Sequence, residues 1–386
     1  MKVQRRSSPI KAAAVFLVLL TAVLPMSKTR ADNWYEKDPG YFTLFDEEGG
    51  RLTVMASEMF KDDEYISGDN RHYSIYSVDK KSKYAFAKFI GDIELPQFEE
   101  VVDETVETLA QKDKNRSILL YCTHSDESYV PSDGKSSIPS EGGIYDVAES
   151  FRDSLEKKGV KAVLDKTSHD PHDAGAYRRS RQTAMELIRK NTPVAAVFDI
   201  HRDAIPKEHY DAMVNGEYMS RVRIVIGRSN QNRKANEQLA YKIKAIADKA
   251  YPGLIKDIYI GKGEYNQELS PRSLLFELGT HEISKEAAQK ATDNLADVVH
   301  KAIFGGVFKS KEPADKDQKK GQAQAPKDKR LKVSPISQEE QKGAGRGIMW
   351  FIVVAVVGFV IFTLISKSGN EIKSSFENIT GKKKRE

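Results

Sequence analysis

Two histidines follow apolar stretches that are typical of buried β-strands. His124 comes directly after ILLYCT. His201 follows VAAVFDI and is itself followed by Arg202 and Asp203. A third apolar stretch, SLLFEL, carries Glu277 near its end. Functional groups of open α/β sheets gather where the strands end, so we expect these side chains to converge at one edge of a sheet.

The residue types in this set are those of a catalytic zinc site. Zinc commonly takes two histidines and one carboxylate and leaves a fourth position for water, whose pKa it lowers to about 7. A further carboxylate outside the ligand set can move protons between the water and a leaving amine. The predicted Zn²⁺ ligands are His124 and His201 together with a glutamate, for which Glu141 is one candidate, and Glu277 is the predicted acid–base residue. Glu127, three residues after His124, is the competing ligand, since Glu141 could instead be a carboxylate favoured at a helix N-terminus.

A basic segment opens one of the predicted helices. It reads Tyr177-Arg178-Arg179-Ser180-Arg181. Guanidinium groups bind carboxylates well, so this helix either grips an anionic substrate or presents a solvated face. The predicted substrate-binding residues are Tyr177, Arg178, Arg181 and Asp203. We further expect Arg202 to hold a substrate carboxylate or a developing oxyanion.

These side chains can meet only if the fold brings the ends of several strands together. The sequence from 114 to 308 has the pattern of strands and helices that such a fold requires. Apolar strands alternate there with amphipathic helices near 144–158, 177–191, 232–249 and 285–304. This alternation predicts an α/β domain with a mostly parallel sheet flanked by helices. Short alternating strands separated by turns predict a small β module at 32–91, and helical spacing predicts a connecting helix at 92–113.

Both ends of the chain carry membrane signals. Residues 1–31 combine a basic start, an apolar run and small residues at a cleavage position, as in a signal peptide or an N-terminal anchor. Residues 347–366 contain no charged residue and are long enough to cross a bilayer, so we expect a transmembrane helix. Residues 309–346 are polar and predict a disordered tether. The basic tail at 367–386 predicts a cytoplasmic C-terminus, with the catalytic domain outside the membrane.

Composition argues against two other classes of protein, a disulfide scaffold and a nucleic-acid-binding protein. The chain has 386 residues and one cysteine, so it cannot be a disulfide-stapled scaffold. The formal net charge is +5, and much of the excess lies in the tether and tail, which argues against nucleic acid as the partner.

The motifs THSDESY, YRRSR, DIHRD and FELG, in this order, resemble those of the stage II sporulation protein P family over about 117–302. The resemblance implies a zinc-dependent N-acetylmuramoyl-L-alanine amidase, with endopeptidase activity on peptide cross-links. It also implies septal wall remodelling during engulfment, with peptidoglycan as substrate and stage II sporulation proteins D and M as partners. The histidines of THS and DIHRD match His124 and His201, and the glutamate of FELG matches Glu277. In the wider amidases a glutamate at a helix start provides the middle ligand, and Glu141 fits that place.

Two alternatives remain open from the sequence. One is a membrane-tethered wall-binding scaffold or activator of another hydrolase, and metal content distinguishes it from an enzyme. The other is a zinc carboxypeptidase acting on stem peptides, and product analysis distinguishes it from an amidase.

Overall fold

The computed structural model describes residues 40–99, 116–173, 175–305 and 307–309. Its main feature is an 11-stranded sheet with the order β2-β1-β5-β4-β3-β13-β12-β14-β9-β7-β8. The strands of the α/β half are β7 (Ser117–Tyr121), β8 (Ala162–Leu164), β9 (Val194–Asp203), β12 (Val222–Gly227), β13 (Ile255–Gly261) and β14 (Ser273–Thr280). Neighbouring strands of this half run parallel except for the antiparallel pair β12–β14. The α/β half thus has the predicted mostly parallel sheet, whereas the sheet as a whole is mixed because the pairs of β1 with β2, β3 with β4, β4 with β5 and β3 with β13 are antiparallel.

Helices cover both faces of this half, as the amphipathic patterns predicted. They are α4 (Ile144–Lys157), α5 (Ala176–Asn191), α6 (Arg233–Ala250) and α7 (Lys285–Phe304). Successive side chains of a strand point to opposite faces. Ile118 and Leu120 of β7 accordingly pack into the core that α4, α6 and α7 cover, whereas Leu119 and Tyr121 pack against α5.

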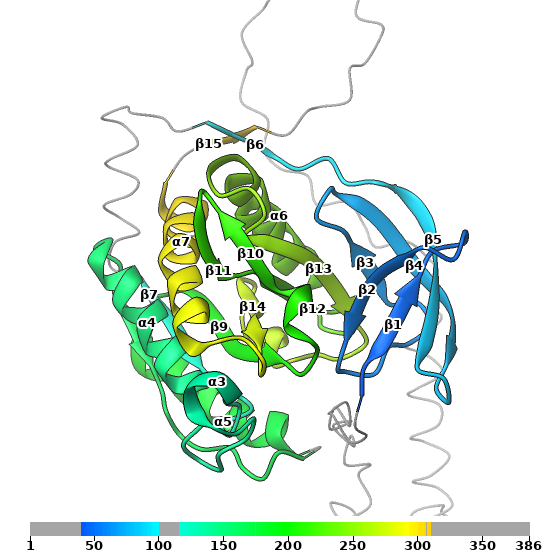
Figure 1. Ribbon diagram of the computed structural model, residues 1–386. Helices are drawn as coiled ribbons and strands as arrows, with labels where there is room; N and C mark the ends of the chain where they lie inside the picture. Colours follow the sequence, from blue (N-terminus) through cyan, green and yellow to red (C-terminus); the bar gives the residue numbers. More distant parts are fainter. Residues whose placement is uncertain (1–39, 100–115, 174, 306, 310–386) are drawn as a thin grey trace, which may run out of the picture. The chain divides into compact units, whose positions relative to one another are not determined.

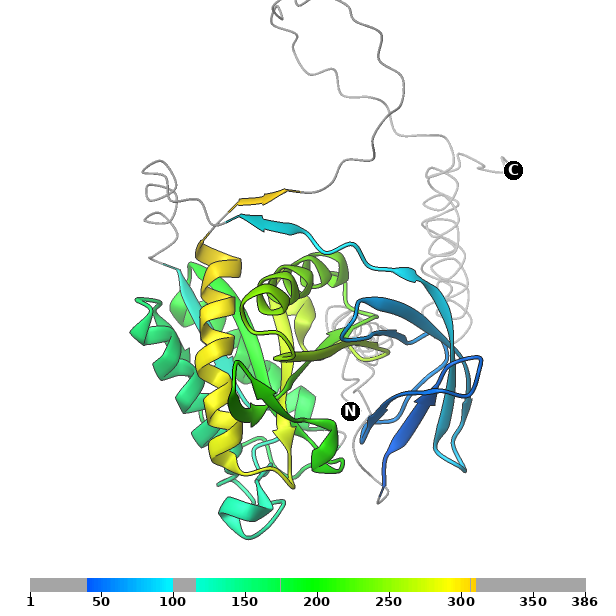
Figure 2. The same ribbon diagram turned by 45° about the horizontal axis from the view of Figure 1, so that its top comes forward.

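The predicted β module is part of the same sheet. Its strands are β1 (Phe42–Phe45), β2 (Arg51–Met55), β3 (Glu64–Ile66), β4 (Arg71–Asp79) and β5 (Tyr84–Asp92). Strand β3 pairs antiparallel with β13, so the module extends the α/β half instead of preceding it as a separate body. Figures 1 and 2 show these blue strands on the side away from α4.

Other elements differ from the expected ones or were not foreseen. The helix expected at 92–113 does not begin there, because Asp92 ends β5 and β6 (Gln97–Glu99) follows and pairs with β15 (Val307–Lys309). A hairpin of β10 (Asp211–Val214) and β11 (Glu217–Ser220) was not predicted. The short elements α3 (Val130–Asp133), η1 (Lys207–His209) and η2 (Gln267–Leu269) lie in loops.

Several predicted segments fall outside the described residues. They are the signal or anchor at 1–31, the rest of the connecting helix, the tether at 309–346 apart from its first residue Lys309, the span at 347–366 and the tail at 367–386. Within the described part of the chain, no helix combines the length and apolar character that a membrane span needs.

A buried ion network ties the β module to the strands of the α/β half. Arg223 of β12 has a fully buried side chain, which lies 2.6 Å from Asp257 of β13 and 3.0 Å from Asp203 of β9. The same guanidinium donates to Thr53 Oγ1 at 2.7 Å and to the carbonyl of Val54 at 3.0 Å, both in β2. Each charge in this network is therefore compensated by a partner on another strand.

Replacing Arg223 alone should destabilise the fold strongly. The change Arg223→Leu leaves the buried carboxylate of Asp203 without its cation and leaves Asp257 with Lys256 as its remaining cation. Loss of one partner of a buried pair costs about 3–5 kcal/mol. Urea denaturation followed by circular dichroism measures the free energy of unfolding. The matched control is Arg152→Leu, since Arg152 pairs with Asp153 at a partly exposed site where an ion pair contributes about 0–1 kcal/mol. Equal losses in the two variants would contradict the structural role of the network.

Candidate metal centre

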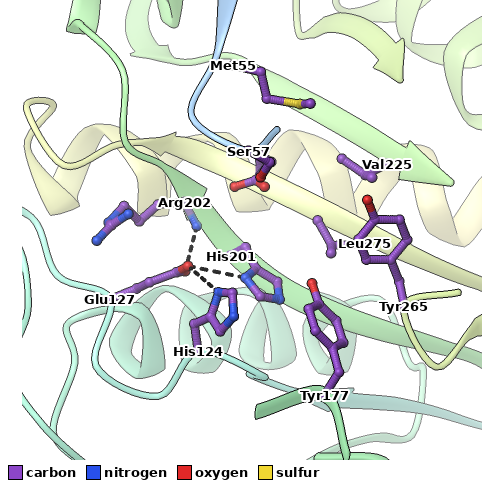
Figure 3. A pocket seen from close by; sticks show the side chains of 11 residues that line it. Met55, Ser57, His124, Glu127, Tyr177, His201, Arg202, Val225, Tyr265 and Leu275 are labelled. Atoms are coloured by element: carbon purple, nitrogen blue, oxygen red, sulfur yellow. Dashed lines mark hydrogen bonds and ion pairs between the residues drawn. The ribbon is translucent and has the colours of Figure 1, made fainter. Parts of the chain in front are cut away.

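Two strand-end histidines and one loop glutamate meet in a buried cluster. His124 follows β7, His201 lies in β9, and Glu127 lies in the loop after β7; all three side chains are buried. Glu127 Oε1 lies 3.1 Å from His124 Nδ1 and 3.2 Å from His201 Nδ1, and Figure 3 shows the three side chains pointing toward one another. The sequence prediction that the two histidines converge is therefore confirmed.

The cluster has the donor set and the spacing of a zinc site. One potential ligand atom from each residue lies within 4.8 Å of the others. Ligands bound to tetrahedral zinc at about 2.0–2.2 Å lie roughly 3.3–3.6 Å from one another, close to the separations found here. Three protein ligands also leave a fourth position, as catalytic zinc sites require. The residues present thus fit a catalytic zinc ion.

The structure places Glu127, and not Glu141, in this cluster. Glu141 is exposed on the loop before α4, so the expectation that it completes the ligand set is wrong for this structure. The loop folds back so that Gly142 and Ile144 donate backbone hydrogen bonds to the carbonyls of Ser125 and Glu127, which leaves Glu141 on the outer side. The backbone N–H of Arg202 donates to Glu127 Oε2 at 2.9 Å and fixes the carboxylate toward the histidines.

A second carboxylate supports His201 from behind. Asp199 Oδ1 lies 3.0 Å from His201 Nε2, and Thr123 donates to Asp199 from its N–H and its hydroxyl. A carboxylate on the far nitrogen orients a metal-binding imidazole and raises its basicity. Sequence reasoning missed Asp199, although its position two residues before His201 in the same strand was a usable signal.

The two histidines differ in protonation. Burial, together with the nearby ring of His172, lowers the pKa of His124 to about 4, so this imidazole is neutral and ready to bind a metal at neutral pH. Burial also opposes a charge on His201, but the carboxylates of Asp199 and Glu127 outweigh it and raise its pKa well above the ordinary value. Without a metal, His201 therefore keeps a proton at neutral pH that a metal ion must displace.

Metal affinity should consequently fall as the pH is lowered. Protons compete with the metal for His201 below its raised pKa, so each unit of acidification should weaken Zn²⁺ binding by about tenfold while one proton is displaced. Competition with a chromogenic chelator, between about pH 5 and pH 8, measures this dependence. Circular dichroism at each pH serves as the control for intact folding. An affinity that does not change with pH would contradict the assignment of His201 as a ligand.

Glu277 lies in β14 directly beside His201 of β9 in the parallel register. It lines the same cleft as the three cluster residues. Its Oε2 is buried and has no hydrogen-bond partner among the described residues. Burial, reinforced by the charge of Asp203, raises the pKa of Glu277 well above its ordinary value. A carboxyl group in this state is suited to accept and return a proton.

Arg202 and Asp203 of the DIHRD run both make contacts within the protein. The guanidinium of Arg202 donates to the backbone carbonyls of Ser128 and Ser136, and it points away from the two histidines in Figure 3. Asp203 accepts hydrogen bonds from the backbone N–H groups of Ala56 and Ala204 and from the hydroxyl of Tyr210, besides its ion pair with Arg223. Asp203 thus makes structural contacts and does not line the cleft, whereas Arg202 lines the cleft while its guanidinium binds backbone carbonyls.

The basic helix contributes one residue to the cleft. Tyr177 lines it, with its ring centroid 5.6 Å from that of His124. Arg178 is exposed on α5 and does not line the cleft. Arg181 forms an ion pair with Glu268 at 2.9 Å. Of the predicted substrate-binding residues in this helix, only Tyr177 is placed at the site.

The remaining walls of the cleft come from segments that sequence reasoning did not connect with it. Met55 and Ser57 belong to the end of β2 and the residues after it, so the β module forms one wall. Val225, Leu275 and Tyr265 line it from β12, β14 and the loop after β13.

His169 has a structural role. Its ring nitrogens form hydrogen bonds with the backbone carbonyl of Cys122 and with the hydroxyl of Thr183.

The chain is thus an α/β protein with a buried two-histidine, one-glutamate cluster of the kind that holds catalytic metals. Residues 51–300 match the sequence model of the family described as Stage II sporulation protein P (SpoIIP), and the chain belongs to this family. The relative from Bacillus subtilis (strain 168) named Stage II sporulation protein P is 29% identical over 198 residues, which cover 47% of this chain and 49% of the relative. The chain therefore spans about half the length of this curated relative.

The comparison with solved structures found two amidases among its matches. The CwlD amidase from Clostridioides difficile, in complex with the GerS lipoprotein, is 16% identical, with a TM-score of 0.33 over 49% of this chain and 95% of that one. An N-acetylmuramoyl-L-alanine amidase from Clostridium difficile 630 is 15% identical, with a TM-score of 0.32 over 49% of this chain and 95% of that one.

Proposed function

We propose that this protein is a zinc-dependent peptidoglycan hydrolase that cleaves the amide bond between N-acetylmuramic acid and L-alanine. The observation that carries the proposal is the buried cluster of His124, Glu127 and His201 with Glu277 in the same cleft. Membership of the stage II sporulation protein P family supports a substrate in the cell wall. Cleavage of peptide cross-links is a second activity that the same cleft could serve.

The residues divide the work of amide hydrolysis. His124, Glu127 and His201 would hold the zinc ion, which when bound lowers the pKa of a bound water and polarises the amide carbonyl. Glu277 takes a proton from the attacking water and delivers it to the leaving nitrogen. A C–O bond forms and the C–N bond breaks, so the lactyl group ends as a carboxylate and L-alanine as a free amine. Asp199 keeps His201 in position throughout.

We extend the proposal to location and partners. Residues 1–31 would act as a signal peptide or an N-terminal anchor, and residues 347–366 would anchor the chain in the cell membrane. The catalytic domain would then lie on the extracytoplasmic side and the tail in the cytoplasm. There the enzyme would thin septal wall during engulfment, together with stage II sporulation proteins D and M. Protease protection in intact cells and in lysed cells tests the orientation, and co-purification tests the partners.

Digestion of purified peptidoglycan by the full-length protein tests the chemistry. The expected products are stem peptides with a new L-alanine N-terminus and sugar chains that retain muramic acid. Release should stop after chelation and return when Zn²⁺ is added back. Removal of single C-terminal residues would instead identify a carboxypeptidase. A protein that binds no zinc and releases nothing would be the non-catalytic scaffold.

A further inference from the structure

An aromatic wall closes one side of the cleft. It consists of Tyr177 from α5 and Tyr265 from the loop after β13, whose ring centroids lie 5.5 Å apart in an edge-to-face arrangement. The ring of Tyr177 also lies 6.4 Å from that of His201, in a nearly parallel orientation. Figure 3 shows Tyr177 next to His124 and His201, and Tyr265 on the far side of Tyr177. A group held against this wall would lie next to the metal site.

The backbone at Tyr265 has an unusual conformation for a bulky residue. Tyr265 has φ +51° and Asn266 has φ +55°, both in the left-handed region. Residues other than glycine that are held in this region cost on the order of 1–3 kcal/mol each, and they persist only where the surroundings enforce them. Such strained positions cluster at binding and catalytic sites.

The two residues that follow Tyr265 are fixed on both sides. The side-chain amide of Asn266 donates to the carbonyl of Tyr177 at 3.1 Å and to Ser180 Oγ at 2.9 Å, both in α5. The side-chain amide of Gln267 donates to the carbonyl of Val225 in β12 at 2.9 Å. These bonds tie the loop to a helix and to a strand, so the strained conformation is enforced from outside the loop.

Two glycines shape the space under the Tyr265 ring. A Cβ atom on Gly261 would lie 2.9 Å from the tyrosine hydroxyl oxygen, and one on Gly263 would lie 2.7 Å from its Cζ atom. Distances below 3 Å between such atoms are essentially never observed, so the tyrosine could not adopt this position over larger residues. The position of the Tyr265 ring therefore depends on three features: the left-handed backbone at Tyr265, the hydrogen bonds of Asn266 and Gln267, and the lack of side chains at Gly261 and Gly263.

We propose that Tyr265 is a substrate-positioning residue whose ring, with that of Tyr177, holds the group beside the scissile amide against the metal site. The inference rests on the proposed function, because it concerns the substrate of the same cleft. The ring of Tyr265 makes apolar contact with the substrate, and its fixed position orients the substrate toward the cluster. Misplacement of a substrate by about 1 Å can lower a rate by about a hundredfold, which gives a reason for maintaining a strained loop.

Steady-state kinetics of the full-length protein on a soluble muropeptide test the proposal. Tyr265→Ala should lower kcat/KM by about 10- to 100-fold at unchanged zinc content, whereas Tyr265→Phe, which keeps the ring, should stay within about threefold. Tyr218→Ala is the matched control, since Tyr218 is an exposed tyrosine in β11, outside the cleft. A second measurement is the affinity for the muropeptide in the inactive Glu277→Gln background, where Tyr265→Ala should weaken binding by a similar factor.

The outcomes separate this inference from the proposed function. A wild type that cleaves no muropeptide would refute the proposed function itself. An active wild type with unchanged kinetics in Tyr265→Ala would overturn the role of Tyr265 alone. If Tyr265→Ala does not fold, Tyr265→Gly replaces it, since glycine accepts φ +51° without strain. Loss of folding in both variants would make the ring structural and would also overturn the proposal.

Discussion

Replacing Glu127 by alanine should abolish stoichiometric zinc binding, whereas replacing Glu141 by alanine should leave it intact. Glu127 contributes the oxygen that lies about equally far from both histidines, so its loss removes one of three ligands. Even loss of an outer-sphere partner weakens metal binding by about 10- to 100-fold, and loss of a ligand should exceed this. Elemental analysis of the purified variants and competition with a chelator measure the effect.

The pair of variants is matched because each change removes one glutamate carboxylate from the segment between β7 and α4. Glu141 is exposed, so Glu141→Ala should retain zinc and hydrolysis of peptidoglycan. The sequence alone favoured the opposite result. Loss of zinc in Glu141→Ala, with retention in Glu127→Ala, would show that the loop after β7 adopts a different arrangement when the metal is bound.

Replacing Glu277 by glutamine should lower kcat by about 10²- to 10⁴-fold while zinc remains bound. Glutamine has nearly the same shape but cannot exchange a proton with the attacking water. Glu277 is not part of the ligand cluster, so metal content should match that of the wild type. The measurement is the rate of stem-peptide release together with zinc analysis of the same sample.

The pH profile gives an independent test of Glu277. Burial and the charge of Asp203 raise the pKa of this carboxyl group, and its basic form is needed to accept a proton, so activity should rise as the pH passes that pKa. This limb of the profile should be lost in Glu277→Gln. Glu282→Gln is the control, since Glu282 is exposed just beyond β14. Wild-type turnover by Glu277→Gln would exclude the carboxyl group from proton transfer.

The strands and helices that position the site were predictable because their signals are local. Hydrophobic periodicity identified α7 over its observed length, the strand that precedes His124 and the strand that contains His201. Convergence of these histidines followed from a general property of parallel sheets. The choice between Glu127 and Glu141 was not predictable, because it depends on how the loop between β7 and α4 folds back through its backbone hydrogen bonds.

Other features depend on partners that are distant in the sequence. Asp203 binds Arg223 and the backbone of Ala56, and neither contact has a trace in the DIHRD motif itself. The left-handed backbone of Tyr265 has no signature in a hydrophobic pattern. The glycines that precede it were a usable signal of close packing, since glycine inside a strand or at its end often marks close approach of other groups.

The pairing of β3 with β13 has a consequence for aggregation. A fragment that begins near residue 114 would remove β3 and leave β13 as the outermost strand of the sheet. The freed edge would contain Ile258 and Ile260, both of which are buried in the intact protein. Long apolar edge strands with unpaired backbone groups recruit strands of other molecules. The β module therefore also covers the edge of β13, and without it we expect this edge to pair with the same edge of another copy of the protein.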